Sequence, residues 1–199
     1  MEAAPDLDSQ SSERIPARDR ILDTSYELFS RHGVKAVGVD TIIERSGVAK
    51  MTLYRHFRSK DELVLAFLRE RESVWTVGWL QAEVEARSDD PRERLLVIFD
   101  VFDDWFRRGD FEGCSFINLM LEAGVDESRI RTACVDHLAN IRVFLGRLAA
   151  DTGAADPDNL ARSWHILMKG AIVSAGEGDT EAARRSQAMG RLVLAAATS

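Results

Sequence analysis

Residues 39–57 contain two short segments with apolar spacing, separated by a glycine, and this pattern restricts the fold more than any other part of the chain. The segment VDTIIERS ends before Gly47, and the segment KMTLYRHF begins at Lys50. A short helix, a tight turn and a second short helix form a helix–turn–helix unit. Leu53 and Phe57 are four residues apart, so they face the same side of the second helix. The small core of the unit is expected to contain Ile42, Ile43, Val48, Leu53 and Phe57.

The same spacing leaves the polar side chains of the second short helix outside the core. A helix of about seven residues is about 10 Å long, which suits a DNA major groove about 12 Å wide. Lys60, in the first turn of the next helix, would combine with the free N–H groups there to form an anion site. The side chains expected at the sides or outside are Lys50, Met51, Thr52, Tyr54, Arg55 and His56.

Basic residues are concentrated near the N-terminus of a chain whose net charge is −7. Residues 14–60 contain ten Lys or Arg and five Asp or Glu, whereas residues 61–199 contain 16 Lys or Arg and 24 Asp or Glu. A basic module ahead of an acidic body favours a polyanion-binding surface at one end of the molecule.

Helical signals recur along the whole chain, and no segment shows sustained strand alternation. Ser59 with Glu62, and Asp90 with Glu93, are capping boxes that open helices. Gly33 is placed to end the first helix in a left-handed conformation. We predict an all-α fold of about nine helices, over approximately residues 16–33, 39–46, 50–57, 60–87, 91–108, 115–123, 127–151, 157–175 and 180–197.

The predicted organisation has three parts. Residues 1–14 are polar and are expected to be a disordered tail. Residues 15–60 would form the helix–turn–helix DNA-binding domain, and residues 61–199 a helical ligand-binding and dimerisation domain. No apolar run approaches the ~20 residues needed to cross a bilayer, and the acidic N-terminus lacks the positive start of a signal peptide. A cytoplasmic protein without membrane association is therefore expected.

The segment GVDTIIERSGVAKMTLYRHFRSKDEL, residues 38–63, resembles the DNA-binding signature of the TetR/AcrR family of bacterial transcriptional regulators. The Gly-Val turn, the Thr-Leu-Tyr-x-His-Phe run and the Ser-Lys-Asp-Glu-Leu continuation carry the resemblance. The strong similarity covers roughly residues 17–70. The remaining part of the chain is similar in length and helical character, as expected of a family whose ligand domains diverge.

The resemblance implies a role for individual side chains. Gly47 would make the turn, and Lys50, Met51 and Thr52 would lie nearest the base edges. Tyr54, His56 and Lys60 would hold backbone phosphates, contacts that position the protein without reading sequence. Thr41 and Arg45 would flank them from the preceding helix.

Two positions depart from the family pattern. Gly38 stands where the family often has a capping Thr or Ser, and Ala49 stands where it often has Ser. Replacing a Ser cap by Ala weakens a helix by roughly 0.5–2 kcal/mol. Neither departure removes a group expected to contact DNA.

Aromatic side chains are frequent in the middle helices, and pockets between bundled helices are common. In the resembled family the effector lies among these helices, and GCSFINLMLEAG at 113–124 resembles a segment at the floor of the pocket. We predict a small effector, apolar in character, and no cofactor or metal. The candidate lining residues are Trp75, Trp79, Phe99, Phe102, Phe116, Met120, His137, Trp164 and Met168.

Small residues recur in the last two helices, where they allow close approach of helices within the chain or between two chains. A single short recognition helix reads too few bases for genomic specificity, and two half-sites about 34–36 Å apart require a dimer. The resemblance places the dimer contact on these two helices. The candidate interface residues are Gly170, Ala171, Ser174, Ala175, Ala183, Ser186 and Gly190.

The expected function is that of a homodimeric, ligand-responsive transcriptional regulator, foremost a repressor released from a pseudo-palindromic operator by an apolar effector. One alternative is an enzyme that uses the aromatic pocket, although the sequence shows no recognisable nucleophile–base pair or acidic cluster. Another is a DNA-binding protein with a filled core and no ligand. An open cavity in the C-terminal domain would distinguish the ligand-responsive regulator from this protein.

Cys114 and Cys134 are expected to be inert buried thiols rather than redox sensors. His137 and His165 are expected to be core or surface histidines rather than metal or hydrolase residues.

Overall fold

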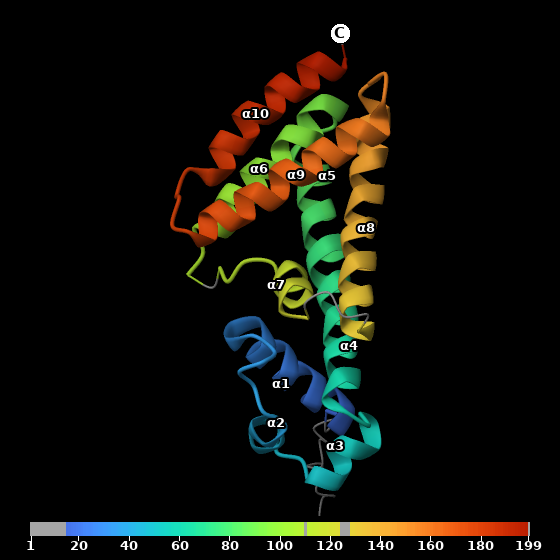
Figure 1. The fold of residues 1–199 in the computed structure, drawn as a ribbon, viewed down its shortest axis with the longest axis vertical. Coiled ribbons are helices and arrows are strands. Elements are labelled where there is room, and N and C mark those ends of the chain that lie inside the picture. The colour runs from blue at the N-terminus through green and yellow to red at the C-terminus, as the bar shows by residue number, and fades with distance from the viewer. Residues whose placement is uncertain (1–14, 110, 124–127, 199) are drawn as a thin grey trace, which may run out of the picture.

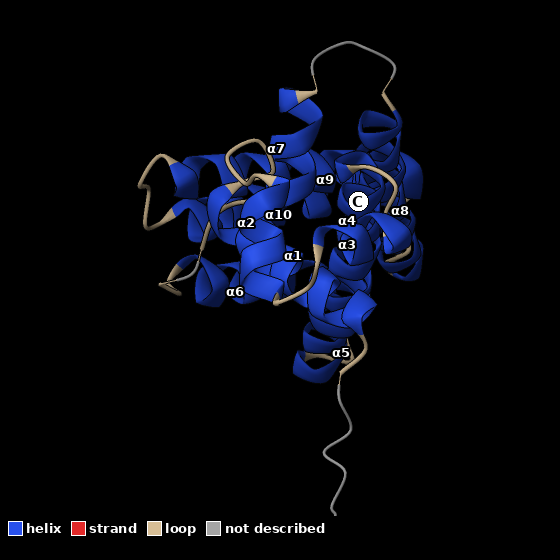
Figure 2. Ribbon diagram, turned by 90° about the horizontal axis from the view of Figure 1, so that it is seen from below, coloured by secondary structure: helices blue, strands red, loops and turns tan. Residues whose placement is uncertain are grey.

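The computed structural model describes residues 15–109, 111–123 and 128–198, and in these ranges every regular element is a helix (Figure 2). A π-helical segment, η1, joins α4 to α5, so three labelled elements form one long helix over residues 60–87. The described residues thus contain nine helices, which confirms the all-α prediction. The expected disordered tail, residues 1–14, lies outside the described residues, and so does Gly124, which follows the predicted helix over 115–123. The elements are α1 (Ala17–His32), α2 (Val39–Ser46), α3 (Lys50–His56), α4 (Lys60–Arg71), η1 (Glu72–Gln81), α5 (Ala82–Arg87), α6 (Pro91–Phe106), α7 (Ser115–Glu122), α8 (Arg129–Asp151), α9 (Pro157–Gly176) and α10 (Ala182–Ala197).

Several helices begin at the caps that the sequence indicates. The Ser59 hydroxyl accepts a hydrogen bond from the backbone N–H of Glu62 (3.2 Å), and the Asp90 carboxylate accepts one from that of Glu93 (2.9 Å). No side chain caps α2 or α3, as expected from Gly38 and Ala49. Gly33 ends α1 with φ 75° and ψ 156°, a positive φ with an extended ψ rather than the predicted left-handed helical conformation.

The small N-terminal domain contains α1, α2, α3 and the first turns of α4, which lie together at one end of an elongated molecule (Figure 1). Phe67 of α4 is fully buried in its core and makes edge contacts with Tyr26 and Phe29, with ring centroids 5.6 and 5.5 Å apart. Because these turns of α4 pack on α1, they belong physically to the small domain. The boundary at residue 60 stays a prediction.

In the C-terminal body, α6 and α8 pack against the long helix, α9 packs on α8, and α10 packs on α9 and α6 (Figure 1). Trp164 of α9 is fully buried, and its indole N–H donates to the carbonyl oxygen of Leu95 in α6 (3.2 Å). Gly190 of α10 faces this indole, and a Cβ added there would lie 2.8 Å from the ring. The three helices therefore meet at a contact that only glycine permits.

The long helix widens at η1, a ten-residue π-helix that the sequence pattern does not reveal. A Cβ added at Gly78 would lie 3.0 Å from the carbonyl oxygen of Ser73, five residues earlier. Glycine therefore fits a wider turn in which the backbone approaches this position closely. π-helical turns are rare and occur frequently at functional sites.

Candidate DNA-binding surface and effector site

The helix–turn–helix unit is closed by a left-handed glycine and a small apolar core. Gly47 has φ 63° and ψ 33°, and the backbone N–H of Val48 reaches back to the carbonyl oxygen of Ile43 (3.4 Å). Leu53 and Phe57 are both buried beside α1, as their spacing predicts. This core fixes which side of α3 faces away from the protein.

The outer face of α3 is exposed and presents apolar, polar and basic groups. Met51 is 80% exposed and Tyr54 39% exposed, and Thr52 is half-buried between them. Arg55, which the sequence analysis did not include among the DNA-binding candidates, is exposed and follows Met51 by four residues on the same face. Met51, Thr52, Tyr54 and Arg55 together line a shallow hollow of about 390 Å³.

Three other predicted DNA-contact residues flank this face. Lys50 is exposed, with its ammonium 3.8 Å from the Asp40 carboxylate, and Thr41 is exposed on α2. The Arg45 guanidinium lies 3.3 Å from the Glu27 carboxylate of α1. Both ion pairs are solvent-exposed and therefore weak, so they leave the basic groups available to a polyanion.

His56 and Lys60 are half-buried near the junction of α3 with α4. The Lys60 ammonium donates to the carbonyl oxygen of Val34, in the connection between α1 and α2 (2.6 Å). An ammonium has three N–H donors, so this bond leaves two for another acceptor. The structure thus gives Lys60 an internal role that the sequence pattern did not indicate.

A very small cavity lies inside the described part of the body. Trp75, Phe102 and Met168, three of the predicted effector residues, line a cavity of only about 10 Å³ together with His165 and other side chains. A single water molecule needs about 10–15 Å³. The interior cavity therefore has no room for an effector in this conformation.

The other predicted effector residues are packed in the body or line a surface cleft between α1 and the body. Phe99 and Trp164 pack against each other, with ring centroids 5.6 Å apart. Phe116 stacks on His137 at 3.3 Å, and Met120 is half-buried against the core. Trp79 is half-buried and lines this surface cleft. The sequence identified these side chains as apolar residues of the middle helices, but this did not distinguish residues that line a pocket from residues that pack in the core.

A cleft of about 500 Å³ lies where α1 meets the long helix and the end of α6. Trp75 and Trp79 are the two predicted effector residues that line it. The chain segments that form it are separated by up to 86 residues, so no local motif signalled it. The lining residues are Tyr26, Glu27, Ser30, Arg31, Arg71, Val74, Trp75, Trp79, Trp105, Arg108 and Glu112.

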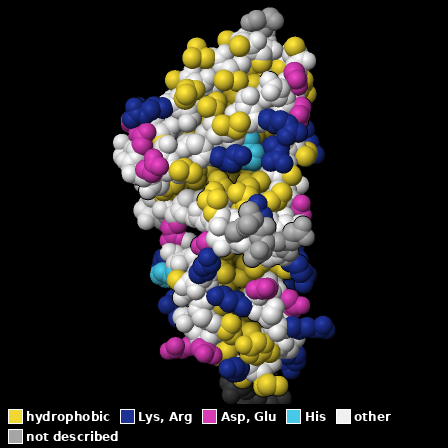
Figure 3. Space-filling model, in the orientation of Figure 1, with side chains coloured by type: hydrophobic (Ala, Val, Ile, Leu, Met, Phe, Trp, Pro, Cys, Tyr) yellow, Lys and Arg dark blue, Asp and Glu magenta, His cyan; other side chains and the backbone are white. Residues whose placement is uncertain are grey.

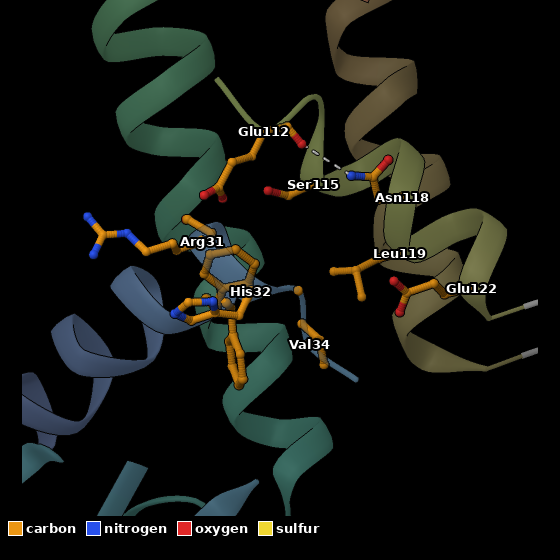
Figure 4. A pocket seen from close by; sticks show the side chains of 12 residues that line it. Arg31, His32, Val34, Glu112, Ser115, Asn118, Leu119 and Glu122 are labelled. Atoms are coloured by element: carbon orange, nitrogen blue, oxygen red, sulfur yellow. Dashed lines mark hydrogen bonds between the residues drawn. The ribbon is translucent and has the colours of Figure 1, made fainter. Parts of the chain in front are cut away.

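A second cavity, of about 230 Å³, separates the C-terminal end of α1 from α7. Figure 4 shows Glu112 and Ser115 on one side of it and His32 and Val34 on the other. Nearby, the Lys35 ammonium donates to the carbonyl oxygen of Glu122 (3.1 Å). The cleft of about 500 Å³ and this cavity of about 230 Å³ therefore both lie at the junction of the N-terminal domain and the body.

Four of the predicted dimer residues are buried within the chain. Ala171, Ala183, Ser186 and Gly190 are covered by the packing of α9, α10 and α6. Gly170 is exposed, and Ser174 and Ala175 are half-buried. Large apolar side chains are exposed on the same two helices: Ile166, Val173, Met189 and Leu192.

The two cysteines are buried free thiols. Burial raises the pKa of both, that of Cys134 to about 11, so neither is a reactive thiolate near neutral pH. Burial also lowers the pKa of His137 to about 4 and that of His165 to about 3, so both histidines are neutral. Across the described ranges no cluster of three or more His, Cys, Asp or Glu could hold a metal, and no helix there is long and apolar enough to cross a membrane.

Comparison with known proteins identifies the N-terminal domain. Residues 21–67 match the family model described as bacterial regulatory proteins, tetR family. The transcriptional activator FasR of Mycolicibacterium smegmatis is 34% identical over 119 residues, which cover 58% of this chain and 53% of FasR. The transcriptional repressor KstR2 of the same organism is 33% identical over 96 residues, covering 48% of this chain and 44% of KstR2. The chain thus matches about half the length of these relatives.

A solved structure extends the similarity to the body. A TetR-family transcriptional regulator from Streptomyces coelicolor superposes with a TM-score of 0.81 and 27% identity, covering 92% of this chain and 90% of the other. A family of regulatory proteins confirms the prediction that the chain is not an enzyme. Residues 21–67 thus match the tetR family of bacterial regulatory proteins, and the architecture of the chain is similar to that of a TetR-family transcriptional regulator.

Proposed function

We propose that the protein is a homodimeric, ligand-responsive transcriptional repressor that binds a pseudo-palindromic operator in the cytoplasm. The observation that carries the proposal is the outer face of α3. Its core side holds Leu53, while Met51 and Tyr54 project outward beside basic residues. A short, exposed helix with this mixture of groups fits the width and chemistry of a major groove.

The roles of the DNA-facing residues follow from their positions. Lys50, Met51 and Thr52, at the N-terminal end of α3, would face the base edges. The hydroxyl of Tyr54, the imidazole of His56 and the remaining donors of Lys60 would contact phosphates. Because phosphate contacts are insensitive to sequence, discrimination between operators would depend mainly on the first three.

A dimer would bring two such helices to two half-sites. Figure 3 shows hydrophobic side chains gathered over the upper part of the molecule, where α9 and α10 lie. Leu192 is 74% exposed and Ile166 65% exposed, which is unfavourable in water unless another surface covers them. We therefore assign the dimer contact to the exposed faces of α9 and α10, including Gly170, rather than to the small residues buried between these helices.

Ligand control requires a site whose occupation changes the placement of the DNA-binding domain. An effector releases the operator only if it binds the DNA-incompetent conformation better, and each tenfold preference contributes about 1.4 kcal/mol. An interior cavity of only about 10 Å³ is what the ligand-free alternative predicts. The ligand-responsive proposal therefore depends on the clefts at the junction of α1 and the body.

A gel-shift assay with the DNA upstream of the protein's own gene tests the proposal. Specific binding should survive excess unrelated DNA and should weaken when small apolar metabolites are added. A Leu53→Asp variant, which removes the core contact of α3, should not bind. If the wild-type protein binds this DNA no better than unrelated DNA, then autoregulation is wrong, and a selection from random DNA tests operator binding itself. If that selection yields no preferred sequence, the regulator proposal fails.

A further inference from the structure

Three tryptophans form one wall of the cleft between α1 and the body. Trp75 and Trp79 come from η1, and Trp105 comes from the last turn of α6. Their ring centroids are 5.0 Å apart for Trp75 and Trp105, 5.3 Å for Trp75 and Trp79, and 6.1 Å for Trp79 and Trp105. At the π-helical segment, the cleft thus has an aromatic wall in which the half-buried Trp75 and Trp79 pack against the buried Trp105.

Arg71 lies on the same cleft and has an unusual set of partners. One of its guanidinium nitrogens donates to the hydroxyl of Tyr26 (3.1 Å) and to that of Ser30 (3.3 Å), and the guanidinium lies over the Tyr26 ring. Within the described parts of the chain, no carboxylate forms an ion pair with Arg71. A half-buried guanidinium that is held by neutral hydroxyls retains its full attraction for an anion.

The remaining charges of the cleft also favour an anion. Glu27 already lies within 3.8 Å of the Arg31 guanidinium and within 3.3 Å of that of Arg45. The lining contains three arginines and two glutamates. A cationic ligand would therefore meet an excess of positive charge among the lining side chains.

We propose that this cleft binds a small organic carboxylate with an apolar, ring-containing body, the carboxylate on Arg71 and the ring against Trp75 and Trp79. The volume of about 500 Å³ lies within the range typical of small-molecule sites. Carboxylate and guanidinium form charge-assisted bonds that are stronger than those between guanidinium and hydroxyl. The inference rests on the proposed function only in making this ligand the effector.

The position of Arg71 also links ligand binding to DNA binding. Its bonds to Tyr26 and Ser30 join the long helix to α1, the helix on which α2 and α3 pack. A carboxylate that draws the guanidinium into the cleft competes with both hydroxyls. Ligand binding would thus weaken one polar link between α1 and the long helix, and so change how the DNA-binding domain is seated.

Calorimetric titration of the full-length protein with 2-naphthoate tests the site, with uncharged 2-naphthamide as the matched ligand. Naphthoate should bind at least tenfold more tightly than the amide and should quench tryptophan fluorescence. Arg71→Gln should lose that preference, whereas Arg69→Gln, an exposed arginine outside the cleft, should retain it. Equal affinity for the acid and the amide, or an unchanged preference in Arg71→Gln, would overturn the proposal.

A second variant keeps the test valid if Arg71→Gln does not fold. Tyr26→Phe retains the ring but removes one hydroxyl acceptor, so it frees Arg71 and should tighten naphthoate binding by about three- to tenfold. Weaker or unchanged binding in Tyr26→Phe would contradict the competition between ligand and α1.

Operator binding measured without naphthoate separates this inference from the proposed function. If the protein binds its operator but shows no preference for naphthoate, the carboxylate site is wrong and the regulator proposal stands. If naphthoate binds as described and no operator is found, the site stands and the regulator proposal fails. If both bind without affecting each other, the cleft is a ligand site but its assignment as the effector site is overturned.

Discussion

The ammonium of Lys60, at the start of α4, donates a 2.6 Å hydrogen bond to the carbonyl oxygen of Val34, 26 residues earlier in the chain. This bond ties the first turn of the long helix to the connection between α1 and α2. Lys60 is also a predicted phosphate contact. Its substitution should therefore affect both the stability of the domain and its affinity for DNA.

Lys60→Ala should destabilise the protein by about 1–2 kcal/mol, because it removes a half-buried hydrogen bond from a charged donor. It should also lower the slope of log affinity against log salt by about one unit, because one phosphate contact is lost. Urea unfolding and gel shifts at several salt concentrations measure the two effects. Lys60→Gln, which retains a donor but no charge, should recover part of the stability and none of the slope. An unchanged slope in both variants would remove Lys60 from the phosphate contacts.

Tyr54→Phe should weaken DNA binding by about five- to tenfold for operator and unrelated DNA alike, because a phosphate contact carries no sequence information. Its hydroxyl makes no hydrogen bond within the described part of the chain, so the melting temperature should not change. Fluorescence anisotropy with both DNAs provides the measurement. A loss confined to the operator would show instead that Tyr54 reads bases.

Gly190→Ala should destabilise the body by about 1–3 kcal/mol, because the new Cβ would lie 2.8 Å from the buried indole of Trp164. Gly146→Ala is the matched control, since it also replaces a glycine within a long helix but has no atom within 4 Å of the added Cβ. That control should gain up to about 1 kcal/mol from helix propensity. Urea unfolding at one fixed protein concentration compares them. Equal stability of the two variants would contradict the close packing at Gly190.

Stability should fall as pH decreases from about 6.5, because His137 and His165 are buried in neutral form. Their pKa values in the folded protein, about 4 for His137 and about 3 for His165, lie below the model value of 6.5 for an unfolded histidine. At a pH between the folded and the unfolded pKa, the unfolded state therefore binds more protons than the folded state. Each pKa unit corresponds to about 1.4 kcal/mol, so the loss between pH 6.5 and pH 5 should be about 2–3 kcal/mol. Above pH 7 these histidines should contribute no pH dependence.

The histidine contribution can be isolated by substitution. His165→Leu should remove about half of this loss in urea unfolding curves recorded from pH 7 to pH 5. His32→Gln, at an exposed position, should leave the pH dependence unaltered. The burial argument is wrong if His165→Leu shows the same dependence as the wild-type protein.

Leu192→Glu should convert the proposed dimer to a monomer and reduce operator affinity by more than tenfold, because each half-site would then be bound alone. Leu192 is 74% exposed on α10, so the substitution should not disturb the monomer fold. Light scattering after size exclusion measures the mass. Val135→Glu, at an exposed position on α8, is the control and should remain dimeric. A Leu192→Glu protein of dimeric mass would place the interface elsewhere.

The sequence alone determined the helices and the face of each helix that is buried. Caps such as Ser59 and Asp90 are local, and the four-residue spacing of Leu53 and Phe57 defines one side of α3 without reference to the rest of the chain. These features depend on interactions between near neighbours in sequence. The fold class and the outward face of α3 were therefore predictable.

Which helix faces meet, and where space remains between them, was decided by the tertiary structure. Gly190 and Ala183 were expected at a surface between two chains, yet the packing of α10 on α9 and α6 buries them within one chain. Trp164 was expected to line a pocket but fills the core, whereas Arg71 faces a cleft that no local pattern marked. Helical periodicity identifies an apolar face, but the same face can pack inside the chain, line a cavity or bind another molecule. Only long-range packing distinguishes these outcomes, because each depends on atoms that are distant in sequence.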